Sequence, residues 1–333
     1  MNYIKLKQKG ILAKRALLLD KLLEKCSVCP RNCQVNRKLN EKGHCKSGYN
    51  PIISSYSLHH GEEPPISGFR GSGTIFFTNC NLNCCFCQNY PISQLGNGNE
   101  ITIQKLSDIM IQLQEQGAHN VNLVTPTHFV PQIVMALCLA IDRGFKIPLV
   151  YNSGGYEAVS TLKLLDGIID IYLPDMKYSD EGCSIKYSNA PAYPEINKKA
   201  VIEMYRQVGN LQFDRNRIAT KGLLLRHLVL PDSIAGSEKS LKFISEKISK
   251  NTYISIMAQY HPAYEASESS ESSKPIFGES SESVKSVMTG KSVKSVMTDN
   301  FSELSRRVTA REYNNVKTLA EKLGLNNGWH QEL

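Results

Sequence analysis

The chain has 333 residues, of which 41% are apolar, and a formal net charge of +8. A chain of this size can bury a sizeable core as one large domain, or as one domain with an appendage. It contains no run of roughly eighteen uncharged apolar residues, so we expect no membrane span. The positive charge is modest and spread along the chain, which favours general solubility over a nucleic-acid partner.

The ten cysteines are too few for a disulfide scaffold in a chain this long. Seven of them fall into two tight groups, a pattern that predicts metal binding in a reducing compartment. We therefore expect a cytoplasmic protein, although the basic start, Met1–Leu19, also resembles an organelle transit peptide. A helical stripe favours a structural helix there instead, and it consists of Ile11, Leu12, Leu17, Leu18, Leu22 and Leu23.

The first cysteine group has the spacing C-x2-C-x3-C-x11-C and consists of Cys26, Cys29, Cys33 and Cys45. Four thiolates can enclose a tetrahedral ion or an iron–sulfur cluster completely. Pro30 is typical of ferredoxin-like cluster loops, while the long final spacer suits zinc equally well. A second iron–sulfur cluster, Zn²⁺ and unmetallated thiols all stay open. With every position filled, such a site would brace the fold or relay electrons.

The segment Leu58–Gly68 follows, and its two prolines and nearby glycines predict a loop without regular structure. His59 and His60 lie within it. Adjacent histidines in a loop are more often exposed or hydrogen-bonded than bound to metal, so we expect no metal site there.

The second cysteine group, Cys80, Cys84 and Cys87, has the spacing C-x3-C-x2-C and follows the strand-like apolar run Gly73–Phe77. Asparagines separate the first two thiols, and Asn favours loops. We therefore expect the three sulfurs on a loop at a strand end. Three thiolates leave one iron of a four-iron cluster open, and an open position is where a metal site does chemistry. Cys85 breaks the spacing and is expected to pack as a small apolar side chain.

The alternative for this group is a set of buried or disulfide-bonded cysteines, which a reducing compartment disfavours. The triplet after a strand is also the signature of the radical S-adenosylmethionine (SAM) enzymes. The chain resembles their branch related to the activating enzymes of pyruvate formate-lyase. The resemblance implies that Cys80, Cys84 and Cys87 hold a [4Fe-4S] cluster, whose open iron is chelated by SAM. It further implies reductive cleavage of SAM to a 5′-deoxyadenosyl radical, with a low-potential flavodoxin or ferredoxin as electron donor.

Apolar runs alternate with helical stretches from Gly73 onward. The runs are Gly73–Phe77, Val121–Val124, Ile147–Tyr151, Ile168–Leu173, Gly222–Leu230 and Tyr253–Met257. The helical stretches are Ile103–Gln116, Pro131–Arg143, Tyr156–Leu165, Pro194–Val208 and Ser237–Ser249. This alternation predicts an α/β fold with a parallel sheet, either open or closed into a barrel. The resemblance implies a partial (β/α)6 TIM-like barrel with its active site at the C-terminal strand ends, preceded by a cysteine-rich metal-binding extension.

Polar residues collect at those strand ends. The resemblance makes the following residues candidates for binding SAM: Phe86, Thr125, Thr127, Asn152, Ser153, Asp175, Lys177, Arg226 and His261. Asn152 and Ser153 are similar to family residues at the ribose hydroxyls, and Thr125–His128 replaces a glycine-rich segment that binds the methionine amino group.

Asp175 and Lys177 match the Asp-x-Lys motif of the activating enzymes. Residues two apart on an extended segment face the same side, so the two could hold the methionine of SAM or pair with each other. Arg226 lies in an apolar run and needs a buried anionic partner, because an unpaired buried charge is costly. His261 follows the last run in a Tyr-His pair that resembles the family's pair near the adenosine.

We divide the chain into three parts. Residues 1–70 form an N-terminal helix and the four-cysteine metal-binding region, and residues 71–264 plus 301–333 form the barrel. Residues 265–300 are predicted to be a disordered low-complexity insertion, in which Ser283–Thr289 repeats as Ser292–Thr298. A final helix is expected at Ala310–Leu323, and Trp329 is expected to pack against the barrel.

The sequence thus predicts a radical SAM oxidoreductase that abstracts hydrogen, with the glycine of a partner protein as one substrate. Two other functions stay open. The chain could modify a small molecule or RNA, or it could be a non-catalytic iron–sulfur or zinc protein that binds a partner.

Overall fold

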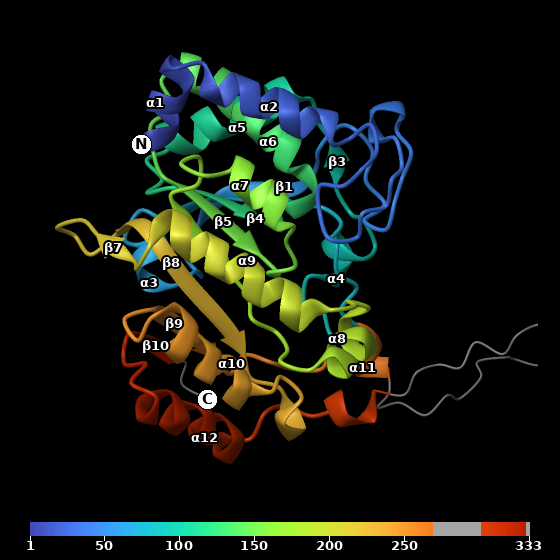
Figure 1. The fold of residues 1–333 in the computed structure, drawn as a ribbon, viewed down its shortest axis with the longest axis vertical. Coiled ribbons are helices and arrows are strands. Elements are labelled where there is room, and N and C mark those ends of the chain that lie inside the picture. Colours follow the sequence, from blue (N-terminus) through green and yellow to red (C-terminus); the bar gives the residue numbers. More distant parts are fainter. Residues whose placement is uncertain (269–300, 331–333) are drawn as a thin grey trace, which may run out of the picture.

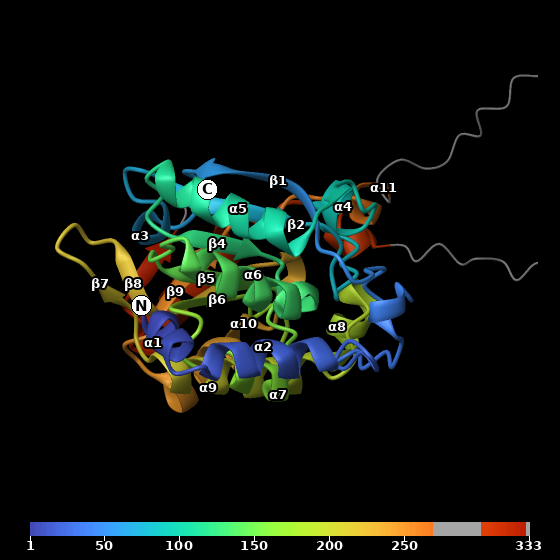
Figure 2. The same cartoon turned by 90° about the horizontal axis from the view of Figure 1, so that it is seen from above.

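A computed structural model describes residues 1–268 and 301–330 (Figure 1). From residue 269 onward, the predicted insertion at 265–300 lies outside the described residues. Helices surround a large twisted sheet in both views (Figures 1 and 2). The mixed α/β class with a large parallel sheet, which the alternating sequence pattern predicts, is confirmed.

The strands form one sheet in the order β10-β9-β8-β6-β5-β4-β2-β1-β3, and β7 pairs with β8 off this path. Neighbours from β2 to β10 are parallel, whereas β1 is antiparallel to both β2 and β3. The strands are β1 (Ile52–His59), β2 (Ser72–Phe77), β3 (Asn99–Glu100), β4 (Val121–Val124), β5 (Leu149–Ser153), β6 (Ile171–Pro174), β7 (Gln212–Phe213), β8 (Ala219–Leu228), β9 (Tyr253–Met257) and β10 (Gly328–His330). The parallel strands follow chain order across the sheet, so their carboxyl ends share one edge.

Helices α1 and α2 precede β1, and the other helices lie between strands in the chain. The helices are α1 (Asn2–Gln8), α2 (Ile11–Lys21), α3 (Pro64–Ser67), α4 (Tyr90–Ser93), α5 (Ile103–Glu115), α6 (Val130–Asp142), α7 (Val159–Leu164), α8 (Glu181–Ser188), α9 (Tyr193–Val208), α10 (Ser237–Phe243), α11 (Glu265–Glu268) and α12 (Ala310–Lys322). Short 3-10 turns occur at Arg37–Leu39, Thr127–Phe129, Pro231–Ser233 and Ser302–Leu304, and α10 continues as a π-helix over Ile244–Ile248. Helix α5 begins at an N-cap, Thr102, whose side chain accepts a hydrogen bond from the Lys105 amide.

The N-terminal segment is a structural helix, as its apolar stripe predicts, and α2 packs against α6. The buried face differs from the expected one. Leu12, Leu19 and Leu23 are buried, whereas Leu17 is 71% exposed and Leu18 is 53% exposed. The spacing of the buried residues along a helix places them on one side, and Leu17 and Leu18 fall outside that side.

The segment at 58–68 is more ordered than its prolines suggest. Strand β1 extends to His59, and Pro64 opens the one-turn helix α3. Proline is tolerated in a first helical turn because its missing N–H has no partner there anyway. The expectation of a loop without regular structure is therefore wrong for both ends of this segment.

Both cysteine groups lie at one end of the molecule. In both views the N-terminal loops between α2 and β1 lie at the same end as α4 and α8 (Figures 1 and 2). Helix α4 follows the three-cysteine loop in the chain, and that loop leaves the carboxyl end of β2. The topology thus brings two groups that are about forty residues apart in the chain to one edge of the sheet.

Candidate functional site

The three-cysteine loop lies between β2 and α4 and is fixed by hydrogen bonds from its backbone and its asparagines. The amides of Asn83 and Cys85 donate to the carbonyls of Ser188 and Tyr187, at 3.0 and 2.9 Å. The Asn81 side chain donates to the Tyr156 carbonyl at 2.7 Å. The loop is therefore held by residues far away in the chain, as a site with a fixed geometry requires.

Cys80, Cys84 and Cys87 each have a hydrogen-bonding neighbour at their sulfur. The amide of Leu82 donates to Cys80 Sγ at 3.3 Å, and the hydroxyl of Ser188 donates to Cys84 Sγ at 2.9 Å. Cys87 Sγ and the Ser93 hydroxyl lie 3.0 Å apart. Such bonds stabilise negative charge on sulfur.

Burial raises the pKa of Cys80 and raises the pKa of Cys84 to about 11, although the Lys177 charge opposes the rise at Cys84. As free thiols these groups are therefore neutral at neutral pH, and a bound cation would be needed to hold them as thiolates. None of the cysteines, all of which lie within the described residues, forms a disulfide.

The three cysteines line a cavity of about 610 Å³. The candidates for binding SAM that line the same cavity are Thr125, Asn152, Ser153, Asp175, Lys177 and Arg226. Its wall also includes His59 from β1 and Trp329 from β10, which lie near opposite ends of the strand order. One cavity thus collects residues from nearly the whole width of the sheet.

The turn after β5 positions part of this wall. Gly155 has φ +72°, and a Cβ at this position would lie 2.2 Å from the Asp175 carbonyl oxygen, so no larger residue fits without a shift. From the start of α9, Tyr193 donates to the Gly154 carbonyl at 2.8 Å and Asn197 donates to the Asp175 carbonyl at 2.9 Å. Helix α9 therefore holds the ends of β5 and β6 together.

Asp175 and Lys177 pair with each other, with Nζ and Oδ2 2.5 Å apart. Burial disfavours the charged form of Lys177, but the charge of Asp175 and the hydrogen bond to it outweigh that effect, and the pKa of Lys177 is raised. The lysine is thus a fixed positive charge beside the three-cysteine loop.

Arg226 has the buried anionic partner that its apolar surroundings predict. Its guanidinium donates to both carboxylate oxygens of Glu63, at 2.7 and 2.6 Å, and also pairs with Glu62. The charge of Arg226 lowers the pKa of Glu63 against the opposing effect of burial. A fourth bond, to Asn152 Oδ1 at 3.3 Å, links this ion cluster to β5.

Three of the predicted cofactor-binding residues do not line the cavity. Thr127 is buried in the turn after β4, where its hydroxyl donates to Glu157 at 2.6 Å and is not available to a ligand. Phe86 is buried edge-on against Tyr260, with ring centroids 5.7 Å apart. His261 lies outside the lining residues, within 3.2 Å of the Gln88 side chain.

Several residues of this site were not predicted. Glu62 and Glu63 come from the proline-rich segment, Ser188 ends α8, and Trp329 belongs to a strand that the sequence did not reveal. Trp329, which is expected to pack against the barrel, packs against the ring of Tyr253 in the neighbouring strand β9, with ring centroids 5.5 Å apart. The position of Arg226 within an apolar run predicted an acidic partner. It did not identify Glu62 and Glu63 as that partner.

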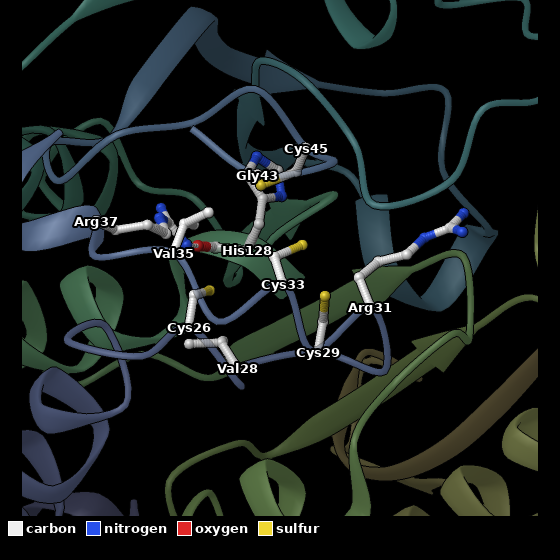
Figure 3. A pocket seen from close by; sticks show the side chains of 10 residues that line it. All are labelled: Cys26, Val28, Cys29, Arg31, Cys33, Val35, Arg37, Gly43, Cys45 and His128. Atoms are coloured by element: carbon white, nitrogen blue, oxygen red, sulfur yellow. Dashed lines mark hydrogen bonds between the residues drawn. The ribbon is translucent and has the colours of Figure 1, made fainter. Parts of the chain in front are cut away.

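A second pocket, of about 10 Å³, collects the four N-terminal cysteines. Figure 3 shows the sulfurs of Cys26, Cys29, Cys33 and Cys45 around one space. Burial raises the pKa of Cys29 to about 12. The amide of His44 donates to Cys33 Sγ at 3.4 Å.

Arg37 and His128 also line the four-cysteine pocket (Figure 3). His128 is buried, and its Nε2 lies 2.9 Å from the Thr78 carbonyl oxygen, to which it must donate. Burial, helped by the Arg37 charge, lowers the pKa of His128 to about 3, so the ring is neutral. Among the described residues, nothing bonds to its Nδ1.

Within residues 1–268 and 301–330, no three His, Cys, Asp or Glu side chains are arranged as ligands of one metal ion. In the same ranges, every helix is too short or too polar to cross a membrane.

Comparison with known proteins found similar proteins, although no protein-family model matches the chain. The crystal structure of Streptococcus suis SuiB bound to precursor peptide SuiA is similar with a TM-score of 0.39 and 15% sequence identity. The similarity covers 54% of this chain and only 37% of that chain.

Another similarity is to a curated protein of Methanocaldococcus jannaschii. The two sequences are 31% identical over 281 residues, which cover 80% of this chain and 74% of the other protein. The chain therefore belongs to the same family as the uncharacterized protein MJ0674 of that organism.

Proposed function

We propose that this chain is a radical SAM enzyme, in which Cys80, Cys84 and Cys87 hold a [4Fe-4S] cluster and SAM binds in the adjoining cavity. One observation carries the proposal. The three sulfurs line the same cavity of about 610 Å³ as Asn152, Asp175 and other strand-end residues for which the family resemblance implies SAM contacts. A cavity of this size accommodates a nucleotide-sized ligand.

The residues present fit such a group. Three thiols line the cavity wall, each sulfur has a hydrogen-bonding neighbour, and no fourth cysteine lines the cavity within the described ranges. Hydrogen bonds to cluster sulfurs tune the reduction potential. Lys177 adds a fixed positive charge beside Cys84.

When bound, the cluster and SAM would supply the one-electron cleavage of the sulfonium, which gives methionine and a 5′-deoxyadenosyl radical. The chain's own residues would bind and orient the substrate. Asp175 and Lys177 carry the opposite charges that a zwitterionic methionine group requires, and Asn152 offers an amide to a hydroxyl. Apolar wall residues such as Val124 and Met257 would help to exclude water.

We further propose that hydrogen is abstracted from the glycine of a partner protein, as the resemblance to activating enzymes implies, with a low-potential flavodoxin or ferredoxin as electron donor. An enzyme acting on a small molecule or RNA would instead turn over without any protein substrate. A non-catalytic iron–sulfur or zinc protein would bind its partner and leave SAM intact.

We infer a partial (β/α)6 barrel for residues 71–264 plus 301–333, with residues 1–70 as a cysteine-rich extension. The support is that the parallel strands follow chain order and that one cavity is lined from both β1 and β10. A sheet curled around that cavity accounts for both observations.

The test is SAM cleavage by anaerobically reconstituted protein with dithionite, measured as 5′-deoxyadenosine and methionine. We expect equal amounts of both products from the unchanged protein and none above background from Cys84→Ala. Cys138→Ala, at a half-buried cysteine on α6 outside both groups, is the matched control and should retain activity. Protein with a full complement of iron and sulfide that leaves SAM intact would refute the proposal.

A further inference from the structure

The four-cysteine pocket contains a buried positive charge without a protein counter-charge. Arg37 is 1% exposed, and its guanidinium donates only to carbonyls, to Gly48 at 3.0 and 2.8 Å and to His128 at 2.5 Å. It also lies over the ring of Phe129, 5.5 Å from the centroid. No carboxylate of the described residues pairs with it. Burying an unpaired charge is costly, so we expect a negatively charged partner for Arg37. The pocket does not contain one while its cysteines are protonated.

Among the described residues that line this pocket, only the four cysteines can carry a negative charge. Cys26, Cys29 and Cys45 are buried, and Cys33 is half-buried. Left as free thiols they are neutral, and Arg37 stays unpaired. Bound to a metal they are thiolates, and four thiolates around Zn²⁺ or a [4Fe-4S] cluster keep a net negative charge.

The second observation is the free Nδ1 of His128. This atom belongs to a side chain that is 1% exposed and lines the pocket, and it has no partner within the described residues. Buried polar atoms without partners are rare in native proteins and often mark an unseen ion or ligand. Because Nε2 donates to Thr78, Nδ1 has a lone pair that suits a metal ion, whereas the Arg37 guanidinium suits negatively charged thiolates. A metal ion held by thiolates supplies both.

We propose that Cys26, Cys29, Cys33 and Cys45, which are not arranged as ligands of one ion while they are free thiols, close around a metal centre as thiolates, and that Arg37 is its buried counter-charge. The centre also braces the three-cysteine loop. His128 donates to the Thr78 carbonyl at 2.9 Å, Asn79 donates to Ser47 at 3.1 Å, and Arg31 donates to the Asn81 carbonyl at 2.8 Å. These contacts tie the residues on both sides of Cys80 to the four-cysteine region.

The first test counts metal in protein that lacks the other site. The variant Cys80→Ala/Cys84→Ala/Cys87→Ala, purified without oxygen, should retain one centre per chain. About one zinc identifies a zinc site, and about four iron with four sulfide identifies a cluster. Adding Cys45→Ser should abolish that metal, while adding Cys183→Ser, at a half-buried cysteine on α8, should not.

Less than about a tenth of a centre per chain in a folded triple variant would overturn the proposal, with folding checked by circular dichroism. If the triple variant does not fold, the unchanged protein is compared with Cys45→Ser alone. Equal metal content in those two proteins would then overturn it. None of these readouts depends on SAM cleavage, so failure here is distinct from failure of the proposed function.

The second test addresses Arg37 through its charge. Arg37→Met keeps much of the length and removes the charge, whereas Arg37→Lys keeps the charge. We expect Arg37→Met to release metal to a chelator roughly tenfold faster, and Arg37→Lys to stay closer to the unchanged protein. In metal-stripped protein the substitution should be stabilising. Arg37→Met should raise the melting temperature there, because an unpaired buried charge is removed. An arginine that only braces the loop would lower the melting temperature in both states, which would refute the counter-charge role.

Discussion

Each cysteine group shares its pocket with an arginine, half-buried Arg226 or fully buried Arg37, and the two arginines differ in what neutralises them. Arg226, in the wall of the large cavity, is paired with Glu62 and Glu63. Arg37, in the four-cysteine pocket, meets only backbone carbonyls among its hydrogen-bond partners in the described residues. The arginine in the large cavity thus has carboxylate partners within the protein. The arginine in the small pocket has none among the described residues, so its charge would be balanced only by a bound group.

The two regions also differ in volume. The cavity at the three cysteines measures about 610 Å³, and the pocket at the four cysteines about 10 Å³. A metal site that does chemistry keeps an open position, while a structural site is closed by its ligands. Size and charge therefore support our proposals of a reaction in the first region and of support for the fold in the second.

The largest effect is expected where the large cavity loses its own counter-charge. Glu63→Ala removes the two-point partner of Arg226 and leaves Glu62 as the one carboxylate that pairs with this guanidinium in the described residues. Breaking a buried ion pair on one side costs about 3–5 kcal/mol. Chemical denaturation should show a loss of this order, and the loss should be the same with and without metal, because this region carries its own charges.

Glu195→Ala is the control for that prediction. Glu195 pairs with Lys199 on the surface of α9, with both side chains more than 60% exposed, so its loss should cost less than about 1 kcal/mol. If Glu63→Ala were no less stable than this control, Glu63 would not be needed to neutralise Arg226. The contrast between the two arginines would then be wrong.

The contrast between the regions could be predicted only in part, because sequence patterns report local structure. Strands β4 and β9 have the predicted bounds, Val121–Val124 and Tyr253–Met257, since short apolar runs buried on both faces stand out. Strand β1 has mixed burial and polar residues, and β10 has three residues, so neither forms such a run. Their existence depends on pairing with strands that are distant in the chain.

The same limit applies to the site. Asn152, Ser153, Asp175 and Lys177 were predictable because each directly follows or ends a recognisable strand. Thr125 and Thr127 stand two apart, yet Thr125 lines the cavity and Thr127 does not. The difference arises from a positive φ at Thr125 and the 3-10 turn that follows, which periodicity does not encode.

The next effect concerns Glu157, a buried carboxyl linked to both regions. It accepts hydrogen bonds from Thr127 and from Tyr151, at 2.6 and 3.0 Å, and its charge raises the pKa of Cys29. Burial raises the pKa of Glu157 itself to about 7. A group with a raised folded-state pKa contributes stability that is full below its unfolded pKa of about 4.3 and is lost as the pH rises through about 7.

The unfolding free energy should therefore fall by about 2–3 kcal/mol between pH 5 and pH 8 on account of Glu157. Glu157→Gln, which resembles the protonated form, should lack this contribution. Asp170, whose pKa burial also raises to about 7, contributes equally to both proteins and cancels in the difference. Parallel pH profiles for the two proteins would show that Glu157 is ionised in the fold, and that the two regions are separated by a charged group.

The smallest effect tests how the protein supports the sulfurs of the open site. Ser188→Ala removes the hydroxyl that donates to Cys84 Sγ at 2.9 Å. One such bond contributes about 1 kcal/mol to stability, and it also favours the more negative, reduced state of a sulfur-bound cluster. Redox titration followed by electron paramagnetic resonance should therefore give a more negative potential for Ser188→Ala. Ser107→Ala is the control, because that buried hydroxyl on α5 has no hydrogen-bond partner within the described residues and should leave the potential unchanged. An equal potential for both variants would mean that Ser188 supports the loop without acting on the cluster. The proposal that the three-cysteine group holds a reactive cluster tuned by its hydrogen bonds would then lose its support.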